Sequence, residues 1–133
     1  MSVVLMDTSV AVPLLLAGHS DHARVAAWAK GRSLAFAGHA VFETYAVLTR
    51  LPAASRLTPD QAGRLIGQYA QNEYHLGLPD REVIDLLARQ GFTGGQIYDA
   101  LVALAAAGNR LASRDRRALE LYDKLDVVVE TVF

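Results

Sequence analysis

Short apolar runs alternate with longer segments of helical pattern along this chain. Five runs predict strands, at residues 2–6, 34–37, 74–78, 110–113 and 126–129. Apolar spacing and terminal cap residues predict helices at residues 9–17, 20–30, 40–51, 58–72, 80–90, 96–107 and 115–124. Strands separated by helical segments pair in parallel, because a parallel connection needs a long crossover. The pattern therefore predicts an α/β fold with a parallel sheet covered by helices on both sides.

Two of these helices carry further local information. Thr58 and Gln61 have the spacing of a capping box, with Pro59 at the first helical position, so a helix is expected to begin there. The helix at 20–30 is expected to pack through a face of small residues and the single tryptophan. That face consists of Ala23, Ala26, Ala27 and Trp28.

Length and composition narrow the class of protein. The 133 residues are enough for one domain, residues 1–133, and a hydrophobic content of 52% supplies a core. The absence of cysteine excludes disulfides, thiolate metal sites and a cysteine nucleophile, and it fits a reducing cytoplasm. The N-terminus lacks the basic segment of a secretory signal, and the longest apolar runs are far short of a bilayer span. We therefore expect a cytoplasmic protein without a membrane segment.

Two aspartates follow predicted strands directly. Asp7 ends the first strand, at the sheet edge where ligands bind in open α/β folds. It is equally well placed to cap the next helix, as are Thr8 and Ser9. Asp115 follows the fourth predicted strand and has the same two interpretations. If these strands are neighbours, both carboxylates lie on one edge, and the hydroxyl of Ser113 points to the same region.

Two further acids lie in apolar helices that begin near the same edge. Glu43 lies in VFETYAVL, where an acid near a helix start is also compatible with an ordinary surface position. Asp99 lies in IYDALVALAAA, where almost every neighbour is apolar. Aspartate is a poor helix former and is costly to bury unpaired. The alternative for Asp99 is a solvated stripe on a helix that is otherwise buried.

Four carboxylates at one edge would repel one another unless a cation neutralised them. Without cysteine or paired histidines, oxygen ligands favour a hard ion, Mg²⁺ or Mn²⁺. A carboxylate-bound Mg²⁺ usually keeps waters and binds phosphates. The acids therefore indicate phosphodiester chemistry with a metal-activated water as the nucleophile.

The basic residues cluster around the fourth predicted strand. The net charge of −1 provides no overall basic field, so nucleic-acid binding must use a local patch or a metal. Arg114, Arg116 and Arg117 flank Asp115 in the sequence. They form either a solvated face or a surface that contacts RNA phosphates beside the metal.

Taken together, these residues resemble the PIN-domain family and, within it, the VapC-type toxins of bacterial toxin–antitoxin modules. The resemblance covers nearly the whole chain and is carried by VVLMDTSV, HAVFETYAVLTRLP and GGQIYDALVALAAAGNRLASRD, in that order. It implies a three-layer α/β/α sandwich with a central parallel sheet in the strand order 3-2-1-4-5. It also implies an endoribonuclease that depends on Mg²⁺, with Mn²⁺ as a substitute.

The resemblance also assigns roles to single residues. The acidic quartet of the family matches Asp7, Glu43, Asp99 and Asp115, with Asp7 and Asp99 as the most direct metal ligands. The supporting hydroxyls of the family match Thr8 or Ser9, and Ser113. Such toxins typically form homodimers, cleave tRNA or rRNA, and are inhibited by an antitoxin protein that covers the acidic groove.

Two other functions remain open from the residues alone. One is a PIN-like RNA-binding module without catalysis, although the loss of an acid that would mark it is not found. The other is a phosphoacceptor or phosphatase-type α/β domain. Such a site needs a lysine near the phosphate, and the chain has only Lys30 and Lys124. A dehalogenase-like site also needs a second aspartate two residues after the first, where this chain has Ser9.

Overall fold

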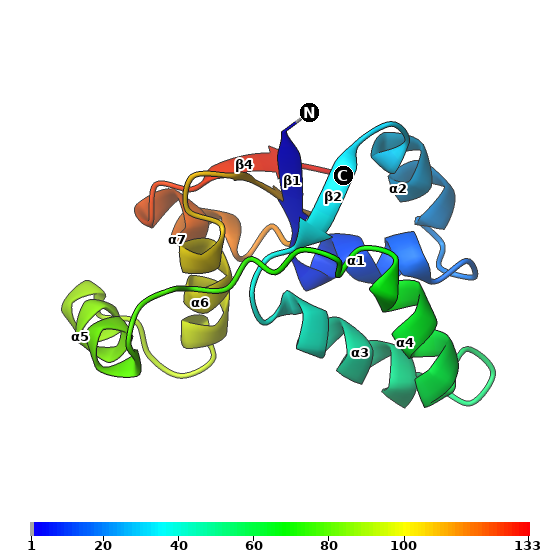
Figure 1. Ribbon diagram of the computed structural model, residues 1–133, viewed down its shortest axis with the longest axis horizontal. Coiled ribbons are helices and arrows are strands. Elements are labelled where there is room, and N and C mark those ends of the chain that lie inside the picture. The colour runs from blue at the N-terminus through cyan, green and yellow to red at the C-terminus, as the bar shows by residue number, and fades with distance from the viewer. Residues whose placement is uncertain (1) are drawn as a thin grey trace.

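The computed structural model describes residues 2–133 and has a parallel sheet at its centre. The strands are β1 (Val3–Met6), β2 (Ser33–Phe36), β3 (Arg110–Ser113) and β4 (Val128–Thr131). They lie in the order β2-β1-β3-β4, and every neighbouring pair is parallel (Figure 1). The central pair places Leu5 opposite Leu111, and both side chains are fully buried. The predicted α/β class is confirmed.

The strand predicted at 74–78 is wrong, so the sheet has four strands in the described residues where five were expected. This segment meets the body of the protein through a hydrogen bond from the Gly38 amide to the Tyr74 carbonyl, at 2.9 Å. His75, Gly77 and Leu78 are exposed. A strand needs a ladder of backbone bonds along a partner, and an isolated bond at the sheet edge does not supply one. The order of the other four strands agrees with the expectation.

Helices occupy the predicted segments, with different ends. They are α1 (Thr8–Leu15), α2 (His22–Ala29), α3 (Ala40–Arg50), α4 (Pro59–Gly67), α5 (Asp80–Gln90), α6 (Gln96–Ala105) and α7 (Leu119–Lys124). The capping box of α4 is confirmed: Thr58 Oγ1 accepts the Gln61 amide at 3.2 Å, and Gln61 Oε1 accepts the Thr58 amide at 2.9 Å. The helix predicted from residue 115 begins later, because Asp115 starts a turn that precedes α7.

The buried face predicted for α2 is wrong in part. Ala23 and Ala27 are exposed, whereas Val25 is fully buried. Trp28 is only partly buried, and its indole N–H donates to Glu130 Oε1 at 2.9 Å. Helix α2 lies at the margin of the molecule (Figure 1), so only a narrow stripe of its surface is buried. Its small alanine side chains can lie on either the buried or the solvent-facing side of the helix.

The sheet and its helices bring distant segments to one edge. Helix α1 begins directly after β1 and packs against both β1 and β3. Helix α3 packs beside α1, and α6 packs beside α7. Figure 1 shows α5 standing away from the sheet, beyond α6. Among residues 2–133, no helix has both the length and the apolar character needed to cross a membrane.

Candidate active site

A cavity of about 70 Å³ lies at the carboxyl edge of the sheet, and acidic side chains dominate its lining. It is lined by Asp7, Thr8, Ser9, Glu43, Asp99, Val102, Asp115 and Tyr122. The structure therefore brings together all four acids singled out in the sequence. They come from the end of β1, from α3, from α6 and from the segment after β3.

Asp7 is both a helix cap and a buried member of this cavity. Its backbone is extended, and its side chain accepts the Ser9 amide, as an N-cap does. The residue is also only 5% exposed. Burial raises the pKa of the Asp7 carboxyl, while hydrogen bonds from Ser113, Ser9 and Tyr122 act in the opposite direction. Asp7 therefore caps α1 and also lines the cavity.

Four donors surround the Asp7 carboxylate. Oδ1 accepts the Ser9 amide at 3.0 Å and the Ser9 hydroxyl at 2.5 Å. Oδ2 accepts the Ser113 hydroxyl at 2.5 Å and the Tyr122 hydroxyl at 3.0 Å. All four donors come from the protein itself, two on each carboxylate oxygen.

The two serine hydroxyls connect Asp7 to the backbone after β3. Ser9 Oγ accepts the Arg114 amide at 2.7 Å, and Ser113 Oγ accepts the Asp115 amide at 3.1 Å. Since each serine has one hydroxyl proton, accepting a backbone N–H leaves that proton free to point at Asp7. The start of α1 and the segment after β3 are therefore both joined to the Asp7 carboxylate by hydrogen bonds.

Asp99 lies in the first turn of α6 and is partly buried. Burial raises the pKa of its carboxyl, and the negative charges of Asp115, Glu43 and Asp7 raise it further. A solvated stripe would not bring three carboxylates near it. Asp99 therefore lines the cavity together with these three acids.

Glu43 and Asp115 complete the acidic lining. Glu43 is exposed in the first turn of α3, and its Oε2 accepts the Thr8 hydroxyl at 3.3 Å. Asp115 is partly buried, and its Oδ1 accepts the Arg117 amide at 3.0 Å. Asp115 therefore caps the turn that leads to α7 while it lines the cavity.

Tyr122 was not anticipated from the sequence. It lies on α7, is 1% exposed, and lines the cavity. Burial, together with the charge and hydrogen bond of Asp7, raises the pKa of the Tyr122 phenol far above its ordinary value, so the hydroxyl stays a donor. The one sequence sign is general: a tyrosine on the apolar side of a helix needs a partner for its hydroxyl.

The three arginines near Asp115 differ in their surroundings. The Arg114 guanidinium pairs with Asp21 at 2.6 Å and donates to the Val132 carbonyl at 2.9 Å. Arg116 is exposed and lies over the Phe133 ring, and Arg117 is exposed as well. Arg114 is therefore engaged within the protein, whereas Arg116 and Arg117 are the exposed members of the three.

The lining can be tested against a hard divalent ion. Within residues 2–133, no three acidic or histidine side chains are gathered closely enough to hold an ion as placed. Magnesium does not require such a cage, because it typically uses one or two carboxylates and keeps its waters. Burial raises the pKa of Asp99 most, and the neighbouring negative charges that raise it further are ones that a cation would offset. The donor chemistry therefore fits Mg²⁺ or Mn²⁺.

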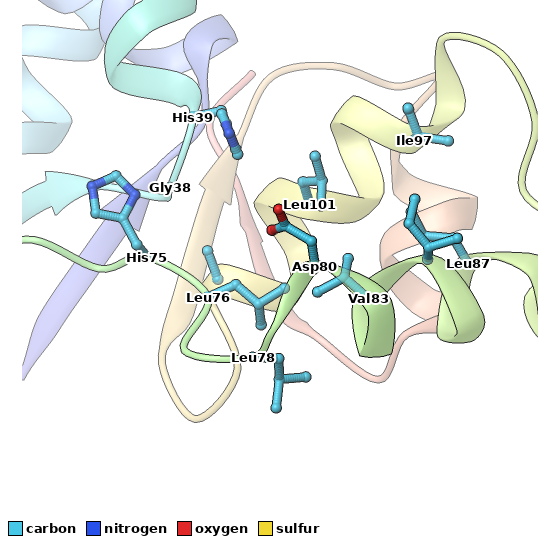
Figure 2. Close-up of a pocket in the computed structure, with 12 residues that line it drawn as sticks. Gly38, His39, His75, Leu76, Leu78, Asp80, Val83, Leu87, Ile97 and Leu101 are labelled. Atoms are coloured by element: carbon cyan, nitrogen blue, oxygen red, sulfur yellow. The ribbon is translucent and has the colours of Figure 1, made fainter.

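A larger cavity, of about 620 Å³, lies elsewhere, between α5, α6 and the irregular segment at 75–78 (Figure 2). Most of its lining is apolar, including Leu76, Val83 and Leu101, and its polar members include His39 and Asp80. None of the four clustered acids lines it. The larger hollow therefore lacks the chemistry of the smaller one.

Comparison with known proteins gives a consistent result. The chain is 49% identical over 127 residues to ribonuclease VapC27 of Mycobacterium tuberculosis, which covers 93% of each protein. It is 40% identical over 131 residues to ribonuclease VapC40 of the same organism, with 95% of this chain and 96% of the relative covered. No family model matches the chain, and no solved structure matches it.

These identities extend over almost the full length of both partners. The chain belongs to the VapC family of PIN-domain ribonucleases.

Proposed function

We propose that this protein is an endoribonuclease that hydrolyses phosphodiester bonds of RNA and acts as the toxin of a toxin–antitoxin module. The observation that carries the proposal is the convergence of four carboxylates from four distant segments on one cavity. Such a cluster is costly to assemble and is typical of a site that binds cations. The names of the two ribonuclease relatives support the same reaction.

The proposed cofactor is Mg²⁺, with Mn²⁺ as a substitute. Asp7, Glu43, Asp99 and Asp115 would hold the ion, directly or through its waters. When bound, the ion supplies an activated water and offsets negative charge at the phosphate. Thr8, Ser9 and Ser113 orient the carboxylates: Thr8 donates to Glu43, and the two serines donate to Asp7.

The proposed substrate is a structured RNA, tRNA or rRNA, and the proposed contacts to its backbone come from Arg116 and Arg117. Both are exposed and close in sequence to Asp115, which lines the cavity. Family membership also supports a cognate antitoxin that covers the acidic groove, a homodimer, and a cytoplasmic location. One domain spanning residues 1–133, with helical layers on both faces of the sheet, remains part of this proposal.

The deciding experiment is cleavage of purified tRNA and rRNA with Mg²⁺, with Mn²⁺ and with EDTA. The wild-type protein is compared with Asp99→Asn and with Asp85→Asn, a matched change on α5 outside the cavity. We expect discrete fragments that require metal, persist in Asp85→Asn and vanish in Asp99→Asn. Cleavage that continues in EDTA, or in Asp99→Asn, would overturn the proposed site.

The same experiment separates the other functions. RNA binding without cleavage, unchanged in Asp99→Asn, would favour a binding module. A phosphoacceptor site is disfavoured by the structure: Lys30 and Lys124 are both exposed, and neither lines the acidic cavity.

A further inference from the structure

Tyr122 joins the acidic cavity from an element that none of the four acids occupies. It lies on α7, and its hydroxyl donates to Asp7 Oδ2 at 3.0 Å across 115 positions of the chain. The residue is almost completely buried and is a cavity-lining member. Its contact with Asp7 is therefore made inside the site, away from bulk solvent.

The Tyr122 hydroxyl completes a three-sided support for Asp7. Ser9 holds Oδ1 from the start of α1, and Ser113 holds Oδ2 from the end of β3. Tyr122 approaches Oδ2 from α7 as a second donor. The terminal torsion of an aspartate has broad minima, so donors from different elements are what fix the plane of its carboxylate.

We propose that Tyr122 is a positioning residue that holds the Asp7 carboxylate in the orientation required for divalent-cation binding. The proposal rests on the proposed function, because it assumes that Asp7 belongs to a metal site. Groups that hydrogen-bond a metal-binding carboxylate set its orientation, and their removal typically lowers metal affinity by about 10- to 100-fold. Tyr122 lines the cavity, and its hydroxyl donates to Asp7, so it is proposed to act through that residue.

The test is the affinity for Mn²⁺ of the full-length Tyr122→Phe protein, measured from the electron paramagnetic resonance of free Mn²⁺. The substitution removes the hydroxyl and keeps the ring that fills the buried position. We expect the Kd for Mn²⁺ to rise by about 10-fold. We also expect RNA cleavage to be weak at low Mn²⁺ and to recover at saturating Mn²⁺, since the carboxylates remain.

The matched control is Tyr69→Phe, which removes a hydroxyl from a partly buried tyrosine that does not line the acidic cavity. Its Kd for Mn²⁺ should equal that of the wild type. If Tyr122 only supported the fold, Tyr122→Phe would lower the thermal unfolding temperature and leave the Kd for Mn²⁺ unchanged. An unchanged Kd in a folded Tyr122→Phe protein therefore overturns the inference.

A second measurement needs no substitution. Addition of Mg²⁺ to the wild-type protein should change the near-ultraviolet absorbance of its tyrosines. The reason is that the Tyr122 hydroxyl donates to Asp7, and a cation bound at Asp7 alters the electrostatic environment of that hydroxyl. A protein that binds Mg²⁺ with no such change contradicts the inference, even if Tyr122→Phe fails to fold.

If the wild type cleaves RNA with bound metal and Tyr122→Phe matches it, this inference alone fails. If the wild type binds no metal, both proposals fail.

Discussion

The hydroxyl of Ser113 donates a hydrogen bond of 2.5 Å to Asp7 Oδ2, although the two residues are 106 positions apart. The parallel pairing of β1 with β3 explains the contact, because Met6 lies opposite Ala112 and the next residues are Asp7 and Ser113. The sheet register thus sets the partner of the most buried acid in the site.

Replacing Ser113 with alanine should destabilise the protein. The side chain is fully buried, donates to Asp7 and accepts the Asp115 amide at 3.1 Å, so alanine leaves the buried Asp7 carboxylate and the partly buried Asp115 amide each short of a partner. We expect a loss of about 2 kcal/mol in the free energy of unfolding, measured by urea denaturation. The exposed Ser55→Ala serves as control and should stay within about 0.5 kcal/mol of the wild type. Equal stability of the two variants would contradict the role of Ser113.

Replacing Thr44 with valine should stabilise the protein. Thr44 is fully buried on α3, and its hydroxyl has no hydrogen-bond partner among the described residues. Valine has nearly the same shape and removes the unpaired group, for an expected gain of about 1 kcal/mol. In the control Thr49→Val, the hydroxyl donates to the Tyr45 carbonyl at 2.8 Å, so no gain is expected there. Differential scanning calorimetry compares both, and a less stable Thr44→Val would refute the prediction.

Metal should stabilise the wild-type protein through its acidic cavity. A ligand that binds only the native state raises the unfolding temperature, so Mg²⁺ should increase it. Asp99→Asn should reduce this shift and should also make the metal-free protein more stable, because the pKa of Asp99 is raised by burial and by three neighbouring carboxylates. Thermal unfolding with Mg²⁺ and with EDTA measures both effects. Asp85→Asn, outside the cavity, should keep the full shift; a full shift in Asp99→Asn would exclude it as a ligand.

The metal-free protein should lose stability as pH rises from about 4 towards neutrality. Asp7 and Asp99 have pKa values raised above their ordinary value of 3.8. Between the unfolded and folded pKa values the native state binds more protons, so raising the pH favours unfolding. Chemical denaturation in EDTA across this range measures the slope, and Asp99→Asn should flatten it. The pKa of Glu130 is lowered, so Glu130 affects the free energy of unfolding in the opposite direction. Its stabilising effect is present near neutral pH and is lost only as the pH falls through the lowered pKa.

Replacing Arg114 or Arg117 with alanine should affect different properties of the protein. Arg114 makes partly buried contacts with Asp21 and the Val132 carbonyl, so Arg114→Ala should lower the stability of the protein. Arg117 is exposed, so Arg117→Ala should leave stability unchanged. It should instead weaken RNA binding and reduce the salt dependence of that binding. Filter binding at several salt concentrations, beside urea denaturation, tests the pair; identical RNA affinity in Arg117→Ala would rule out its phosphate contact.

Local chemistry was predictable from the sequence where neighbours in the chain supply the partner. The capping box of Thr58 and Gln61 formed as expected, and Asp7 caps α1. The strand at 74–78 did not form, since a strand depends on a partner that local pattern does not reveal. The three-layer arrangement stays a prediction.

The sequence by itself determined the kinds of residue available for chemistry: isolated acids after strands and within apolar helices, with no cysteine. The resemblance already grouped four of them, and the tertiary structure places all four in one cavity. Tertiary structure alone decided that Tyr122 and Ser113 both donate to Asp7. It also turned Arg114 towards Asp21. The physical reason is that side-chain direction, burial and long-range hydrogen bonds follow from packing between distant elements, whereas caps and periodicity act within one or two turns.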